Sequence, residues 1–212
     1  MATRSELLWE FLRKAVHLSS LLIVVVYTVL LNYFSDRVAI LVMTAFLLVF
    51  LEIEHFRIEH RPNLMRFLDR IFRTKEENRM SSAPFMIISC IIAFSAFEYW
   101  VAFVALMMTV FGDLFAALFG KMFGKMKLLN EKTLVGTLAG FAANIMVGLS
   151  ALPNFAFLIL VMAVVATFVE LVTNKLDDNL TVPMFAGFAG QMFVYFTGIS
   201  LPPIDFTFLG LF

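Results

Sequence analysis

The chain has 212 residues and no net charge, with 61% hydrophobic and 15% charged side chains. Its mean hydropathy is +0.92. Soluble domains have an apolar share near one half, so this composition excludes an ordinary soluble domain. The balanced charge gives no indication of nucleic-acid binding, and the single Cys90 provides neither a disulfide nor a cysteine zinc cluster. We expect an integral membrane protein.

Apolar runs of about 20 residues cross a bilayer as helices, because every backbone polar group there must be satisfied internally. The sequence predicts an all-α, polytopic fold that forms one membrane-embedded catalytic domain over residues 1–212. The second and third of seven predicted spans look short. No cleavable signal peptide is evident, so we expect the first span to remain in the mature protein. The predicted spans are 16–34, 38–53, 83–97, 99–120, 134–152, 155–173 and 180–201.

Lysine and arginine gather in a few places: three precede the first span, seven lie between residues 57 and 79, and four lie between 121 and 132. Short cytoplasmic loops collect basic residues. We therefore place the N-terminus, the loop 55–82 and the turns 121–132 and 175–179 in the cytoplasm, and the C-terminus outside. In a prokaryotic cell, this would be the inner membrane.

Four polar residues share one helix face where the chain enters the membrane: Glu10, Arg13, Lys14 and His17. One interpretation is a juxtamembrane basic anchor with an internal ion pair. The other is that this face lines a site, since His17 lies one turn inside the boundary, where a spare polar group is costly.

The loop after the second span contains an amphipathic pattern. Its apolar face predicts a cytoplasmic helix that lies in the headgroup plane. Most of its charged residues are explained by solvation, while Glu54 and Arg57 at the membrane edge are weaker candidates for ligand contact. The apolar positions are Leu64, Phe67, Leu68, Ile71 and Phe72.

The segment 112–148 holds six of the ten glycines and places Asp113 inside an apolar run. Small residues four apart usually indicate close helix packing, and this explains two glycine rows. The rows are Gly112, Ala116, Gly120 and Gly124, and Gly136, Gly140, Asn144 and Gly148. It does not explain Asp113, because a carboxylate within a membrane segment indicates function by default.

After Asp113 the chain leaves the membrane through a lysine-rich turn and re-enters through Thr133, Gly136 and Thr137. Glycine permits close backbone approach, lysine supplies positive charge, and carboxylates hold divalent cations. We interpret the segment as a phosphate-and-metal site at a membrane surface. The turn has no Walker pattern, so another fold would hold the phosphates. The residues of this predicted site that precede the re-entry are Gly112, Lys121, Gly124, Lys125 and Lys132.

A polar stripe crosses the end of the sixth span, with Glu170, Asn174, Asp177 and Asp178 at helical spacing before Asn179. Helix termination and a new helix start explain part of it. A stripe that reaches inward to Glu170 exceeds what capping requires, so we favour a functional site.

These acids, lysines and the upstream Arg-Lys-His trio fit phosphoryl transfer. That reaction needs a cation on the phosphate oxygens, opposing basic groups, and a base that orients the acceptor hydroxyl. A site at the membrane surface suits an acceptor hydroxyl at headgroup level, which is a lipid alcohol.

The order GDLFAALFGKMFGK, KTLVGTLAG, the upstream ExxRKxxH and the downstream DDNLTVP resembles the dolichol kinase, phytol kinase and CTP-dependent diacylglycerol kinase group, from Glu10 to Pro183. The resemblance implies a polytopic helical enzyme that uses CTP and a divalent cation, Mg²⁺ or another, to phosphorylate a polyprenol, phytol or diacylglycerol. It assigns nucleotide binding to the region from Gly112 to Gly136. Relatives often have an acid where this chain has Val135, which leaves a cation role there in doubt.

On this basis we expect Asp113 to hold the metal, with Asp177 or Asp178 as a second ligand and Asp178 as an alternative general base. The expected phosphate and nucleotide contacts are Gly112, Lys121, Gly124, Lys125, Lys132, Thr133, Gly136 and Thr137. Arg13, Lys14 and His17 would line the same site and act in catalysis, oriented by Glu10. The expected supporting residues are Glu10, Glu170, Asn174 and Asn179.

Two alternatives remain open. A phosphatidate cytidylyltransferase would release pyrophosphate, although its long C-terminal signature with paired Asp beside Pro-Gly-His is absent. A small ion-coupled transporter would use Asp113 and Glu170, but no matching repeat halves are found. The lipid, the preference for CTP over ATP and the oligomeric state, a homo-oligomer included, stay open.

Overall fold

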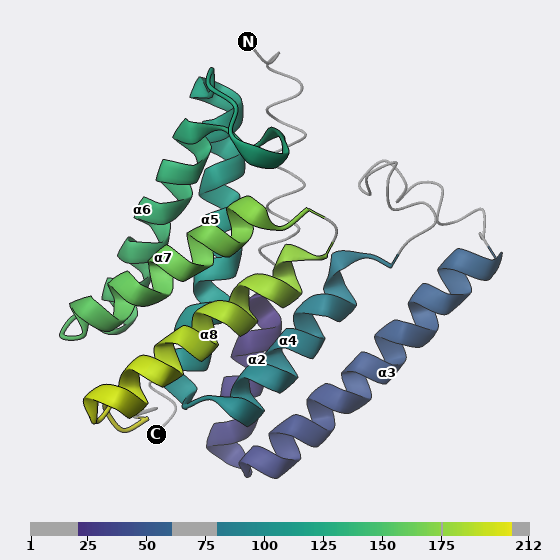
Figure 1. Cartoon of the computed structure of the whole chain (residues 1–212). Coiled ribbons are helices and arrows are strands. Elements are labelled where there is room, and N and C mark those ends of the chain that lie inside the picture. The colour runs from purple at the N-terminus through teal and green to yellow at the C-terminus, as the bar shows by residue number, and fades with distance from the viewer. Residues whose placement is uncertain (1–20, 61–79, 175, 205–212) are drawn as a thin grey trace.

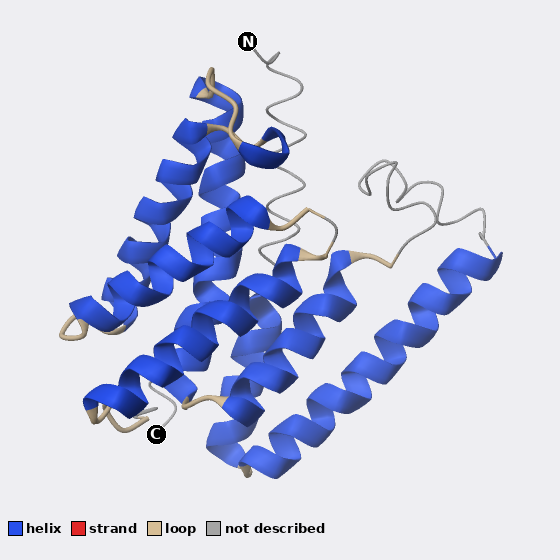
Figure 2. Cartoon of the chain, in the orientation of Figure 1, coloured by secondary structure: helices blue, strands red, loops and turns tan. Residues whose placement is uncertain are grey.

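The computed structural model describes residues 21–60, 80–174 and 176–204. Seven α-helices and one short 3₁₀ turn account for most of these residues, and the described connections between them are short (Figure 2). The elements in chain order are α2 (Leu21–Tyr33), α3 (Asp36–His60), α4 (Ser82–Ala96), α5 (Tyr99–Phe123), η3 (Leu129–Glu131), α6 (Leu134–Ala151), α7 (Ala156–Val172) and α8 (Asp178–Thr197). Each α-helix falls on one predicted span, η3 lies in the predicted lysine-rich turn, and the all-helical prediction is confirmed for the described part of the chain.

Four of the helices, α3, α5, α6 and α8, are long and apolar enough to cross a membrane, by length and composition. The shorter apolar helices α2, α4 and α7 have 13, 15 and 17 residues. The short second span was a wrong expectation, because α3 has 25 residues and continues past Ile53. In its polar last turns, Glu54 and Arg57 are buried and bond to each other, and Glu54 also bonds to Ser81, while His55 and Glu59 are exposed.

Successive helices run in alternating directions, so their connections gather at two ends of the bundle (Figure 1). The turn between α5 and α6, the turn between α7 and α8, the start of α4 and the end of α3 all point to one end. The sequence predicted that these segments lie on one side of the membrane, and in the fold they lie at the same end of the bundle (Figure 1).

The central helix is α5, which separates two hydrophobic cores. Val101, Val104 and Met108 on one face pack with α7 and α8, while Ala102 and Leu106 on another face pack with α2, α3 and α4. More than half of the α5 membrane window is buried, 56%, against 17% for α3. α3 lies at the edge of the bundle in Figure 1.

The glycine rows of α5 and α6 lie against each other, as their spacing predicted. A methyl group on Gly136 would lie 2.6 Å from the backbone oxygen of Ala116, and one on Gly140 would lie 3.1 Å from the Ala116 methyl. Gly120 and Gly124 in turn lie against Thr133. The two helix backbones therefore approach closely, which sets the turn between them directly above the contact.

Replacing Gly136 by alanine should destabilise the protein by about 1–3 kcal/mol, because the methyl meets a backbone oxygen that cannot move aside. Thermal unfolding in detergent measures this. Ala142→Leu is the matched control on the same helix, since Ala142 is exposed. Equal melting temperatures for Gly136→Ala and the unmodified protein would contradict the close contact.

Candidate functional site

Five polar side chains from α5, the α5–α6 turn, α7 and α8 meet at one end of the bundle. At their centre is the Lys132 ammonium, which lies 3.3 Å from Asp178 Oδ2 and 3.8 Å from Glu170 Oε1. It also donates a hydrogen bond to the backbone oxygen of Glu170. Asp113 and Asp177 are close enough to Asp178 for their charges to interact. We call Asp113, Lys132, Glu170, Asp177 and Asp178 the carboxylate–lysine cluster.

Lys132 is held in place by the elements on both sides of it. Thr133 caps α6, because its hydroxyl oxygen accepts a hydrogen bond from the Gly136 amide at 3.2 Å. Lys132 is the residue immediately before this cap. The close contact between α5 and α6 below the turn brings its side chain over the end of α7.

The end of α7 supplies the acidic and carbonyl partners. Glu170 lies in the last turn and is only 8% exposed, so its carboxylate is removed from water. A buried carboxylate is costly unless it is paired, and the Lys132 ammonium compensates it. The negative end of the helix dipole also favours a cation at this place.

Asp177 and Asp178 have different roles in the start of α8. Asp177 is the N-cap: its Oδ1 accepts from the backbone and side-chain nitrogens of Asn179, each at 2.9 Å. Its Oδ2 accepts from the Ser82 hydroxyl at 3.1 Å, which ties α8 to the start of α4. The interpretation as a new helix start is therefore confirmed for Asp177. The Oδ1 atom of Asp178 has no hydrogen bond within the described part of the chain, which makes Asp178 the carboxylate best placed to accept a ligand.

The predicted metal ligands, Asp113, Asp177 and Asp178, all belong to the carboxylate–lysine cluster. No group of three or more His, Cys, Asp and Glu side chains is arranged to hold a metal ion within residues 21–60, 80–174 and 176–204. Mg²⁺ is commonly bound by one or two carboxylates together with substrate phosphates, not by a complete protein cage. Asp113 and Asp178, whose charges interact, stay the predicted ligands of such a shared site.

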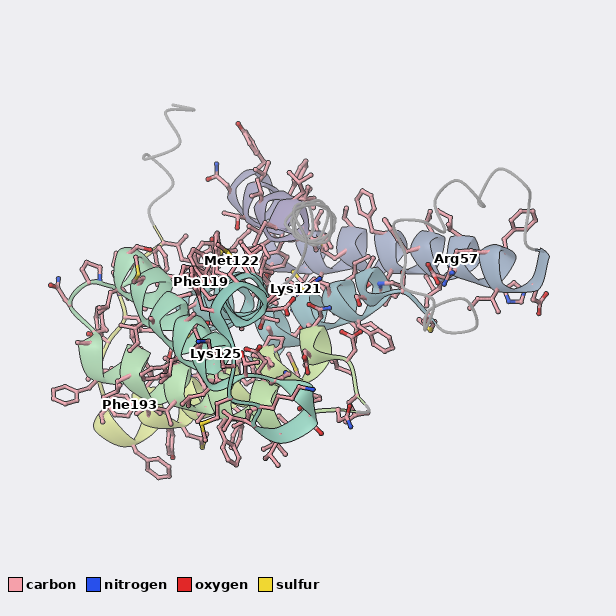
Figure 3. The ribbon with its side chains drawn as sticks, turned by 90° about the horizontal axis from the view of Figure 1, so that it is seen from above. Arg57, Phe119, Lys121, Met122, Lys125 and Phe193 are labelled. Carbon is pink, nitrogen blue, oxygen red and sulfur yellow. The ribbon has the colours of Figure 1, made fainter. Side chains whose placement is uncertain are left out.

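The other predicted nucleotide residues lie around the cluster. Lys121 and Lys125 are exposed near the end of α5, well away from Arg57 on α3 (Figure 3). Gly112 is a helix contact, since a methyl group there would lie 2.5 Å from Asn144 Oδ1. Thr137 lies one turn inside α6, partly buried.

The supporting residues divide. Asn179 is buried and bonded to Asp177, whereas Asn174 is exposed beyond the end of α7. Glu10, Arg13, Lys14, His17 and the predicted interfacial helix in 61–79 lie outside the described residues.

A second polar group joins α3 to α4. The Arg57 guanidinium contacts Glu54 Oε2 at 2.7 Å, and the Ser81 hydroxyl donates to Glu54 Oε1 at 2.8 Å. Because Ser82 bonds to Asp177, the two adjacent serines connect this group to the cluster. Sequence reasoning missed both serines; their position directly before a predicted helix was the available signal.

A comparison with protein families matches residues 2–180 to the cytidylyltransferase family. No curated protein and no solved structure matches the chain significantly.

Replacing Lys132 by methionine should destabilise the protein by about 1–3 kcal/mol, because the buried Glu170 carboxylate loses its cation while the site keeps partial access to water. Chemical or thermal unfolding in detergent measures the change. The double variant Lys132→Met/Glu170→Gln removes the uncompensated charge and should recover most of the stability. If Glu170→Gln gives no recovery in the Lys132→Met background, the pairing does not stabilise the fold.

Proposed function

Because the chain belongs to the cytidylyltransferase family, we propose that it transfers the cytidylyl group of CTP to the phosphate of a membrane lipid of the phosphatidate type. The family is enzymatic, and its match covers most of the chain, from residue 2 to residue 180. This match is the observation on which the proposal rests. The carboxylate–lysine cluster supports the proposal, because the Lys132 ammonium lies beside the carboxylates of Glu170 and Asp178 at one end of the helix bundle.

In this reaction an oxygen of the lipid phosphate attacks the α-phosphorus of CTP. A new phosphorus–oxygen bond forms, the bond between the α-phosphorus and the bridging oxygen breaks, and pyrophosphate leaves. The attacking phosphate is already ionised near neutral pH, so the enzyme has to position and neutralise its reactants more than to remove a proton.

The residues divide this work. Asp113 and Asp178 would hold a divalent cation, which neutralises triphosphate charge when bound. Lys132 keeps Asp178 and Glu170 in place and presents positive charge beside them. Lys121 and Lys125, exposed at the end of α5, would contact the outer phosphates. Asp177 and Thr133 fix the helix starts on which the cluster is built.

A lipid-alcohol kinase is the second candidate. The spacing of Lys132, Thr133 and Gly136 after the glycine row of α5, and of Asp177 to Asn179, resembles the CTP-dependent lipid kinases. There the lipid hydroxyl would attack the γ-phosphorus, CDP would leave, and the hydroxyl proton would pass to a carboxylate. Asp178 suits this role, because Lys132 contacts its Oδ2 atom and leaves Oδ1 to accept the proton.

We propose seven membrane crossings. α4 runs between the end of α3 and the start of α5, and α7 runs between the end of α6 and the start of α8, so these two shorter helices connect opposite ends of the bundle (Figure 1). If the four long helices cross, α4 and α7 must cross too, which makes six; the seventh crossing is α2, which falls within the predicted first span 16–34. The basic turns favour a cytoplasmic side for the cluster, where CTP would be available.

Labelled CTP distinguishes the two reactions. With purified protein, Mg²⁺ and either phosphatidate or a lipid alcohol, cytidylyl transfer puts label from the α-phosphate on the lipid, and kinase activity puts label from the γ-phosphate on it. We expect α-label on phosphatidate. Exclusive γ-label on a lipid alcohol would establish the kinase instead, and no labelled lipid from either position would reject both.

Asp113→Asn should lower turnover at least about a hundredfold, because it removes a charge from the cation site while keeping side-chain volume. Asp36→Asn is the control: Asp36 is an exposed acid at the opposite end of the bundle. Near-normal turnover of a folded Asp113→Asn protein would remove this acid from the mechanism.

A further inference from the structure

The turn between α5 and α6 is an ordered structure. Lys127 and Thr133 form an antiparallel bridge, flanked by hydrogen bonds from the Leu128 amide to the Lys132 oxygen at 2.7 Å and from the Leu134 amide to the Met126 oxygen at 3.0 Å. Within it, Asn130 has φ 54° and ψ 38°, and it is the one described non-glycine residue with positive φ. Asparagine tolerates this left-handed conformation better than most residues.

The side chain of Asn130 reaches α7. Its Nδ2 donates to the backbone oxygens of Leu171 at 3.2 Å and Val172 at 3.0 Å. Lys132, two residues later, donates to the backbone oxygen of Glu170. The last three carbonyls of α7 are therefore all bonded by side chains of the α5–α6 turn. Such carbonyls have no partner within their own helix, so these bonds attach the turn firmly to it.

We propose that Asn130 is a positioning residue: it fixes the α5–α6 turn on the end of α7 so that the Lys132 ammonium lies between Glu170 and Asp178. The consequence for CTP binding rests on the proposed function; the positioning itself does not. Asn130 meets two requirements together. Its backbone adopts the left-handed conformation, and its amide supplies a donor that faces two acceptors.

Other residues meet only one of these requirements. Glycine adopts the same backbone conformation without strain but offers no side-chain donor. Aspartate matches the size of asparagine and also tolerates positive φ, but its carboxylate would face two carbonyl oxygens and repel them. Asn130→Gly therefore isolates the loss of the amide, and Asn130→Asp converts attraction into repulsion.

The test measures the reactivity of the Lys132 amine with a water-soluble acetylating reagent, by mass spectrometry of protein in detergent. In Asn130→Gly we expect Lys132 to acetylate roughly three to ten times faster, since the ammonium spends less time with its partners. Asn130→Asp should show an equal or larger increase. Lys125 is the internal control, because it is exposed and already open to the reagent. Asn154→Gly, an exposed asparagine in the α6–α7 turn, is the matched control variant.

An unchanged Lys132 rate in both Asn130 variants would overturn the proposal. Equal acceleration of several lysines with a lowered melting temperature would also overturn it, because that pattern indicates general loosening.

Equilibrium binding of labelled CTP to the same variants separates this inference from the proposed function. Faster acetylation of Lys132 with several-fold weaker CTP binding supports both. Faster acetylation with unchanged CTP binding supports the positioning role of Asn130 and contradicts the use of Lys132 at a CTP site.

Discussion

The carboxylate–lysine cluster depends on one ammonium group. Lys132 contacts the carboxylates of Glu170 and Asp178 and the last turn of α7, so a single charge connects the start of α6 with the ends of two other helices. A buried carboxylate such as Glu170 is tolerable only with a partner of this kind. In a membrane bundle, where the hydrophobic effect discriminates little between helix arrangements, such a polar contact selects one arrangement over others.

The rest of the structure brings that ammonium to its place. The glycine contacts let α5 and α6 approach closely, and the turn above them is folded by its own backbone bonds and attached to α7 by Asn130. On the other side, Asp177 caps α8 and bonds to Ser82, which makes the start of α4 a neighbour of the site. Helix packing, helix capping and charge pairing therefore all act on the position of the Lys132 ammonium and its partners.

This architecture suits chemistry on a membrane lipid. The cluster lies at the end of a bundle whose long helices are apolar enough to span a bilayer, so a lipid headgroup and a water-soluble nucleotide could meet there. Both candidate reactions use CTP and both require negative charge to be neutralised next to fixed carboxylates. They differ in the phosphorus atom that is attacked, and this depends on where the lipid acceptor lies relative to the bound triphosphate.

The sequence by itself determined the helical class, the order of the helices and the residue types of the site. Apolar runs, the intramembrane Asp113 and the stripe from Glu170 to Asp178 are local patterns whose physical cost is visible without coordinates. It did not indicate the length of α3, since the buried Glu54 in its polar end also bonds to Ser81, which is distant in sequence. It also could not separate the capping role of Asp177 from the open position of Asp178, or identify Asn130. Those distinctions depend on which atoms meet across helices, and only the tertiary structure decides that, because hydrogen bonds and ion pairs act over a few ångströms in space whatever the separation along the chain.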